Sequence, residues 1–175
     1  MRYGENPHQT ASILQNSFNQ FGIPGAQLVQ GKDLSYNNIN DADAALQLIK
    51  EFDPKEDATV AIIKHANPCG VASGESLHEA YRKALACDPN SAFGGIIALN
   101  KKLDAETAKL ITEIFTEIII APGATDEAKS IIALKKNIRL LVCKNMFEQN
   151  YESNFKSIQG GICLLYTSPS PRDRG

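Results

Sequence analysis

The sequence lacks several features that would place it in a specialised class of protein. Its 175 residues include no tryptophan and only four cysteines, and no two of these cysteines form a CxxC pair. Such sparse cysteines exclude a disulfide-stapled scaffold and agree with a reducing cytosol. Basic and acidic side chains nearly balance, at a net charge of −2. The sequence therefore has no basic excess of the kind that nucleic-acid binding proteins show.

Long hydrophobic runs are also missing. No window approaches the roughly 18 apolar residues of a membrane span, and the first residues hold no apolar core of a signal peptide. We therefore expect a cytoplasmic protein that binds neither membranes nor nucleic acids. At roughly 100 to 200 residues per domain, the length fits one domain with a real core.

Short strands of the buried type alternate with amphipathic helices along the chain. This alternation predicts an α/β layered domain with a mostly parallel central sheet and flanking helices. Asn40 is expected to cap the first helix, and Ser76 with Glu79 forms a capping-box pattern that opens the second. The other expected elements are strands at 59–63, 94–99, 117–121 and 138–142 and helices at 105–115 and 127–134.

The last residues differ from everything before them. From Cys163 on, the strand and helix periods stop, and Ser-Pro-Ser-Pro-Arg follows at 168–172. One interpretation is a disordered C-terminal tail. We favour another, in which residues 163–175 resemble the translation of a sequencing-library adapter and residues 1–162 are a truncated natural sequence.

Polar side chains follow the expected strand 59–63 directly, in the segment 64–70. Ligands of α/β sheets bind beyond the carboxyl ends of strands, so this segment is the first candidate site. A lone histidine such as His65 is more often a structural residue than a functional one. Lys64 beside it favours function, because a cation placed where a buried strand surfaces is desolvated unless it meets an anion. Cys69 has no thiol partner and is expected to be an apolar filler.

The same segment resembles part of a zinc deaminase motif, which needs a glutamate two residues after the histidine and a second cysteine three residues after the first. Asn67 and Ala72 stand at these two positions. The proton shuttle and one thiolate are therefore missing, and we expect no metal.

Two further segments are weaker candidates when each is taken alone. Residues 88–95 read as a helix-to-strand connection, although the paired glycines Gly94 and Gly95 would let a ligand approach the backbone closely. Residues 2–9 read as a polar arm, although Arg2 is suited to bind a phosphate.

Five segments together, in this order, resemble the PurH family of bifunctional purine biosynthesis proteins. They are residues 2–9, 34–38, 64–70, 88–95 and 119–123, of which the Lys-His-x-Asn-Pro-Cys-Gly motif at 64–70 is the most specific. In that family an IMP cyclohydrolase domain precedes a phosphoribosylaminoimidazolecarboxamide (AICAR) formyltransferase domain. Residues 1–162 resemble the N-terminal part of the second domain. The resemblance implies a cytidine-deaminase-like half-domain and a homodimeric full-length parent.

The resemblance implies transfer of a formyl group from the co-substrate 10-formyltetrahydrofolate to the 5-amino group of AICAR. That amine is a poor nucleophile because its lone pair is delocalised, so His65 would act as the general base. Lys64 would stabilise the negative charge that develops on the formyl oxygen or orient the folate nitrogen. By the same carry-over, the substrate-binding residues would be Arg2, Tyr3, Asn67, Phe93, Gly94 and Glu117. The alternative is a non-catalytic nucleotide-binding fragment, because the family supplies other site residues from later in its sequence.

Overall fold

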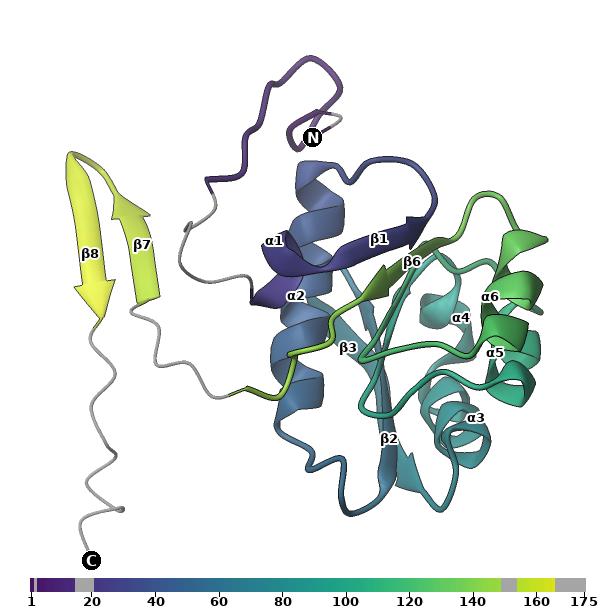
Figure 1. Cartoon of the computed structure of the whole chain (residues 1–175). Helices are drawn as coiled ribbons and strands as arrows, with labels where there is room; N and C mark the ends of the chain where they lie inside the picture. The colour runs from purple at the N-terminus through teal and green to yellow at the C-terminus, as the bar shows by residue number, and fades with distance from the viewer. Residues whose placement is uncertain (2, 15–20, 149–153, 166–175) are drawn as a thin grey trace, which may run out of the picture.

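Figure 1 shows the computed structural model, which describes residues 1, 3–14, 21–148 and 154–165. One six-stranded sheet forms the middle layer, and helices cover both of its faces. The predicted α/β class is therefore confirmed. No helix in these four described stretches is long and apolar enough to cross a membrane.

The elements follow one another as a layered α/β chain. The sheet has the order β1-β6-β5-β4-β2-β3, and a separate hairpin pairs β7 with β8. The strands are β1 Gln27–Gln30, β2 Ala58–Lys64, β3 Asn67–Gly74, β4 Ile96–Leu99, β5 Ile118–Ala121, β6 Arg139–Val142, β7 Asn154–Ile158 and β8 Gly161–Leu165. The helices are α1 Gly22–Gly25, α2 Tyr36–Lys50, α3 Leu77–Cys87, α4 Pro89–Ala92, α5 Ala105–Ile111 and α6 Asp126–Ala133.

The direction of the strands decides which of their ends meet. β5 is parallel to β4 and to β6, whereas β2 is antiparallel to both of its neighbours and β1 is antiparallel to β6. It follows that β3, β4, β5 and β6 run in one direction and only β1 and β2 run against them. The expected mostly parallel sheet is confirmed in this sense. Sequence analysis did not predict β1 as a strand and did not give the direction of β2.

Two apolar cores lie on the two faces of the sheet. One packs the sheet against α3, α5 and α6, and the other packs it against α1 and α2. Successive residues of β2 alternate between them, with Val60 and Ile62 in the first and Ala61 and Ile63 in the second, as the period of two in a strand requires. Burial on both faces explains why the inner strands are uninterrupted apolar runs.

The predicted cap of the first helix is wrong. Ser35, not Asn40, caps α2, and its hydroxyl accepts a hydrogen bond from the backbone N–H of Asn38. Asn40 lies on the exposed side of the helix. The apolar period of this helix begins only after a polar first turn, so a search that starts from the apolar positions places the cap too late.

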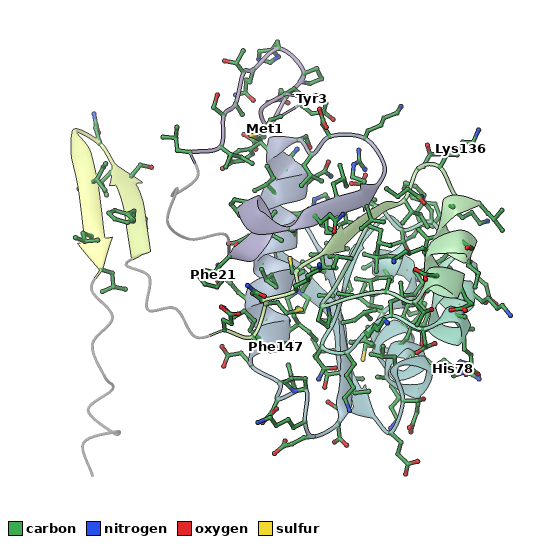
Figure 2. All side chains as sticks on the ribbon, in the orientation of Figure 1. Met1, Tyr3, Phe21, His78, Lys136 and Phe147 are labelled. Carbon is green, nitrogen blue, oxygen red and sulfur yellow. The ribbon has the colours of Figure 1, made fainter. Side chains whose placement is uncertain are left out.

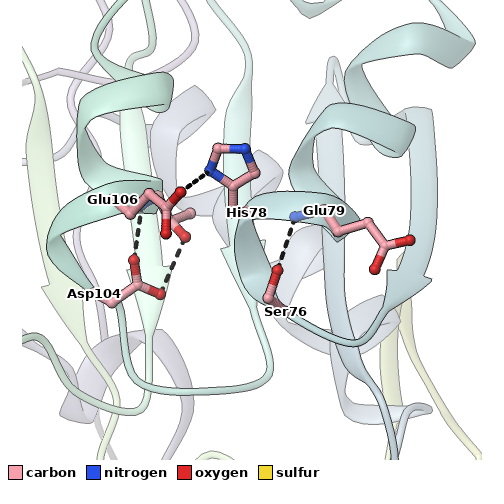
Figure 3. A network of polar contacts seen from close by, with 6 residues as sticks. Ser76, His78, Glu79, Asp104 and Glu106 are labelled. Carbon is pink, nitrogen blue, oxygen red and sulfur yellow. Dashed lines mark hydrogen bonds and ion pairs between the residues drawn. The ribbon is translucent and has the colours of Figure 1, made fainter.

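Helices α3 and α5 lie side by side, and the polar contacts at their starts include one that joins them, between His78 and Glu106 (Figure 3). Ser76 caps α3 as predicted, because its hydroxyl accepts from the backbone N–H of Glu79. The Glu79 carboxylate accepts from the N–H of Glu75 instead of closing the expected capping box. His78 Nδ1 lies 3.1 Å from Glu106 Oε1, close enough for an ion pair although not aligned as a hydrogen bond. This network lies apart from the residues that we predicted to be functional.

The hairpin of β7 and β8 bears on the expected division of the chain. The boundary between residues 162 and 163 falls inside β8, and residues 166–175 of the expected tail lie outside the described residues. The division into 1–162 and 163–175 therefore stays a prediction.

Candidate active site

Several of the predicted site residues lie at the same end of the sheet, where β2 ends and β4 and β5 begin. The pairing register places the last residues of β2 beside the first residues of β4, and these beside the first residues of β5. Lys64 closes β2, Phe93 and Gly94 precede β4, and Glu117 precedes β5. We expected the site residues to follow the carboxyl ends of strands, and among these residues only Lys64 and His65, at the end of β2, do so. Because β2 runs against its neighbours, β4 and β5 contribute their amino ends.

A tight turn presents His65 at this end of the sheet. His65 and Ala66 join β2 to β3 with φ angles of 52° and 58°, both in the left-handed region. Two consecutive left-handed residues are what a type I′ hairpin turn requires, but in residues other than glycine they cost on the order of 1 kcal/mol each. Asn67 stabilises the turn, because its Nδ2 donates to the backbone oxygen of His65 at 2.7 Å. Such strain is typical of functional sites.

The segment after this turn is a strand that sequence analysis did not predict. Residues from Asn67 onward pair with β2 as the edge strand β3, with a shift in register next to Pro68. Pro68 and Gly70 hid the strand from sequence analysis, since proline and glycine are depleted in strands. An edge strand accepts proline because one side of its backbone has no partner.

A pocket of about 380 Å³ lies at this turn. It is lined by Lys64, His65, Asn67, Pro68, Cys69, Asp88 and Ser91. The Lys64 ammonium donates to the backbone oxygen of Phe93 at 2.9 Å, which ties the end of β2 to the segment before β4. Three of the residues expected to act on substrate thus line one cavity. A somewhat larger cavity, at the carboxyl ends of α5 and α6, contains none of them.

The pocket contains the thiol of Cys69 together with one acidic and one basic side chain. Burial raises the pKa of the Cys69 thiol, the Asp88 carboxylate raises it further, and the Lys64 ammonium lowers it. Asp88 itself caps α4 through the N–H of Ser91 at 2.9 Å, and its bonds to Ser91 are the main cause of a lowered carboxyl pKa. The pKa of Cys69 therefore depends on both of these charged groups.

We expect iodoacetamide to alkylate Cys69 more slowly than the exposed Cys87 at pH 7.5. The thiolate is the reacting form, and a raised pKa leaves less of it at this pH. Asp88→Asn should accelerate alkylation of Cys69, because it removes one cause of the raised pKa while asparagine still caps the helix. Mass spectrometry of each cysteine measures the alkylation rates. Cys143 is the internal control, and burial raises its pKa to about 11. An unchanged Cys69 rate in the variant would contradict this electrostatic account.

Phe93 and Gly94 do not line the pocket, but the backbone oxygen of Phe93 binds Lys64, which does. Phe93 is 58% exposed, and its ring centroid lies 5.5 Å from that of Phe115. Gly94 has a φ of 74°, and its N–H donates to the backbone oxygen of Phe115 at 2.7 Å. An aromatic face held in this way beside a lysine is available to a planar heterocycle.

Glu117 has a partner that sequence analysis did not assign to the site. Asn38, in the first turn of α2, donates from Nδ2 to Glu117 Oε2 at 2.8 Å. The segment 34–38 was recognised as a motif, but without any role for Asn38. The signal was therefore present in the sequence, whereas the contact across 79 positions appears only in the fold.

The N-terminal arm reaches the same helix start. The backbone oxygen of Tyr3 accepts from the N–H of Tyr36 at 3.1 Å, and that of Glu5 accepts from Asn37 Nδ2 at 3.1 Å. Figure 2 shows Tyr3 near this end of α2. Arg2 lies outside the described residues. Within the part of the chain that is described, no group of three or more histidine, cysteine, aspartate or glutamate side chains could hold a metal ion.

Comparison with known proteins identifies the family. The AICARFT/IMPCHase bienzyme family matches residues 1–172. The bifunctional purine biosynthesis protein PurH of Chelativorans sp. (strain BNC1) is 61% identical over 165 residues, and those of Bartonella henselae and Paracoccus denitrificans are both 64% identical over the same length. Each alignment covers 94% of this chain and 31% of the relative, so the chain spans about a third of their length. The chain belongs to the AICARFT/IMPCHase bienzyme family.

Proposed function

We propose that this chain is part of an enzyme of purine biosynthesis that transfers a formyl group from 10-formyltetrahydrofolate to the 5-amino group of AICAR. The observation that carries the proposal is the pocket in which Lys64 and His65 stand side by side at the end of a buried strand. A general base and a cation are the two groups that this reaction needs. The membership of the chain in the AICARFT/IMPCHase bienzyme family supports the same activity.

The chemistry divides between the two side chains. The amine nitrogen of AICAR bonds to the formyl carbon, and His65 accepts the proton that the amine loses. The bond between the formyl carbon and N10 of the folate then breaks, and that proton ends on N10. Lys64 has three N–H donors, of which one binds the Phe93 oxygen, so two remain for the formyl oxygen as it gains negative charge.

The surrounding residues bind the substrate in this proposal. Phe93 stacks on the imidazole ring of AICAR, and Gly94 lets the ring approach the backbone. The carboxylate of Glu117 accepts from the N–H groups of the base. The remaining predicted contacts are those of Asn67 in the pocket and of Arg2 and Tyr3 with the ribose phosphate.

A second candidate is a nucleotide-binding fragment without activity of its own. The observation in its favour is that the chain spans only 31% of the length of its relatives. A catalyst needs its groups held to within about an ångström, and an incomplete set loses orders of magnitude in rate. We therefore assign the activity to a full-length homodimeric parent, which also carries an IMP cyclohydrolase domain. The parent requires no zinc.

The test compares the 175-residue chain with the full-length protein. We expect the 175-residue chain to bind AICAR weakly and saturably in calorimetry but to produce no tetrahydrofolate from 10-formyltetrahydrofolate. The full-length protein should produce tetrahydrofolate only when AICAR is present. A full-length protein without this activity, or one whose activity requires bound zinc, would refute the proposal. Formyl transfer by the isolated chain would refute the division of roles.

A further inference from the structure

The segment 34–38 has no role in the chemistry described so far, yet two of its polar side chains are buried. Ser35 is 3% exposed and Asn38 is 8% exposed. They bind each other reciprocally: the Ser35 hydroxyl accepts from the Asn38 N–H at 3.3 Å, and Asn38 Oδ1 accepts from the Ser35 N–H at 3.2 Å. This capping box fixes the Asn38 side chain to the start of α2.

The two ends of the Asn38 amide therefore have different tasks. Its oxygen is occupied by the helix cap, and its nitrogen donates to Glu117 Oε2 at 2.8 Å. The network settles which end is which, because the reverse orientation would place two N–H groups together and an oxygen against a carboxylate. A hydrogen bond from an amide to a carboxylate is charge-assisted and hence stronger than one between neutral groups.

Glu117 is held at its backbone as well. Its N–H donates to the oxygen of Gly95 at 3.0 Å, and its oxygen accepts from the N–H of Arg139 at 3.0 Å. The sheet ladder thus fixes the backbone of Glu117, and Asn38 binds Oε2. Within the described part of the chain no hydrogen bond to Oε1 is found, so this oxygen can accept one from a ligand.

We propose that Asn38 is a positioning residue that holds the Glu117 carboxylate with one oxygen turned to the substrate. The inference rests on the proposed function, in which Glu117 binds the N–H groups of AICAR. The same helix start also binds the N-terminal arm, through Tyr36 and Asn37. The start of α2 thus contacts both the arm and the acidic residue of the site.

The first arm of the test needs no activity, and it measures thermal unfolding of the 175-residue chain. Asn38→Asp keeps the acceptor for the Ser35 N–H but turns an oxygen toward Glu117, so we expect the melting temperature to fall by roughly 3–8 °C. Adding Glu117→Gln to this variant should recover most of the loss, because the glutamine amide can donate to the carboxylate introduced in α2. Asn40→Asp is the matched control, since it makes the same change on the exposed side of the same helix.

The second arm measures formyl transfer by the full-length protein. Asn38→Asp should raise the KM for AICAR about tenfold or more and change kcat much less, because a misdirected Glu117 weakens binding of the base. Asn40→Asp should change neither. If Glu117→Gln fails to recover the stability of Asn38→Asp, the positioning inference is wrong. If stability is recovered but KM never changes, the inference fails in its functional part, and the assignment of Glu117 to AICAR falls with it while formyl transfer itself stands.

Discussion

Replacing His65 by alanine in the full-length protein should lower the rate of formyl transfer by roughly two to four orders of magnitude, the usual contribution of a general base. The imidazole makes no hydrogen bond with any other residue in the described part of the chain, so both ring nitrogens are available to a substrate. Histidine suits this task because its charge changes near neutral pH. The measurement is tetrahydrofolate formation at saturating AICAR.

The fold should survive this substitution, so a loss of activity would report on the chemistry and not on misfolding. His65 is exposed, and alanine has the same Cβ and adopts a left-handed φ next to it at Ala66. His78→Ala is the matched control, because it removes a histidine from the contact between α3 and α5 (Figure 3) and should leave turnover unchanged. Full turnover of His65→Ala would exclude His65 from the mechanism.

Gly70→Ala should destabilise the chain by at least about 3 kcal/mol, near the upper end of what overpacking causes. A Cβ at this position would lie 2.0 Å from the backbone oxygen of Ala84 and 3.0 Å from Cys87 Cβ. The first of these is a backbone atom of α3, so it cannot turn aside as a side chain would. The methyl group must push β3 away from the helix that covers it.

Urea unfolding of the 175-residue chain measures this loss, and Gly123→Ala is the control. The nearest atom to a Cβ at Gly123 is Lys102 Cγ at 3.4 Å, in a flexible side chain, so the free energy of unfolding should change by less than about 0.5 kcal/mol. Equal stability of the two variants would contradict the close packing of β3 on α3. Because β3 begins with Asn67, a displaced strand should also disturb the turn that presents His65.

The elements that sequence analysis predicted well are those whose signal is local. β2 and β5 are apolar on both faces, so an unbroken run predicts them without knowledge of their neighbours. β3 was missed because proline and glycine interrupt its pattern. Its place as a strand depends on pairing with β2 and on cover by α3, which is information from elsewhere in the chain.

The candidate site divides in the same way. Lys64 and His65 could be chosen from the sequence, since they follow a buried strand within a specific motif. Asn67 could be chosen from the motif as well, but the bond that it donates to the backbone oxygen of His65, which stabilises the turn, appears only in the structure. The bond between Asn38 and Glu117 could not be predicted, because it joins a helix start to a strand start that only the sheet brings together.

The sequence by itself determined the alternation of strands and helices, the family resemblance and the segments that carry the chemistry, because side-chain periodicity and short motifs are local properties. The tertiary structure decided the directions of β1 and β2, and with them which strand ends lie side by side. Strand direction depends on pairing between residues far apart in the chain, which no local pattern encodes. These strand directions place Lys64, Phe93 and Glu117 at the same end of the sheet.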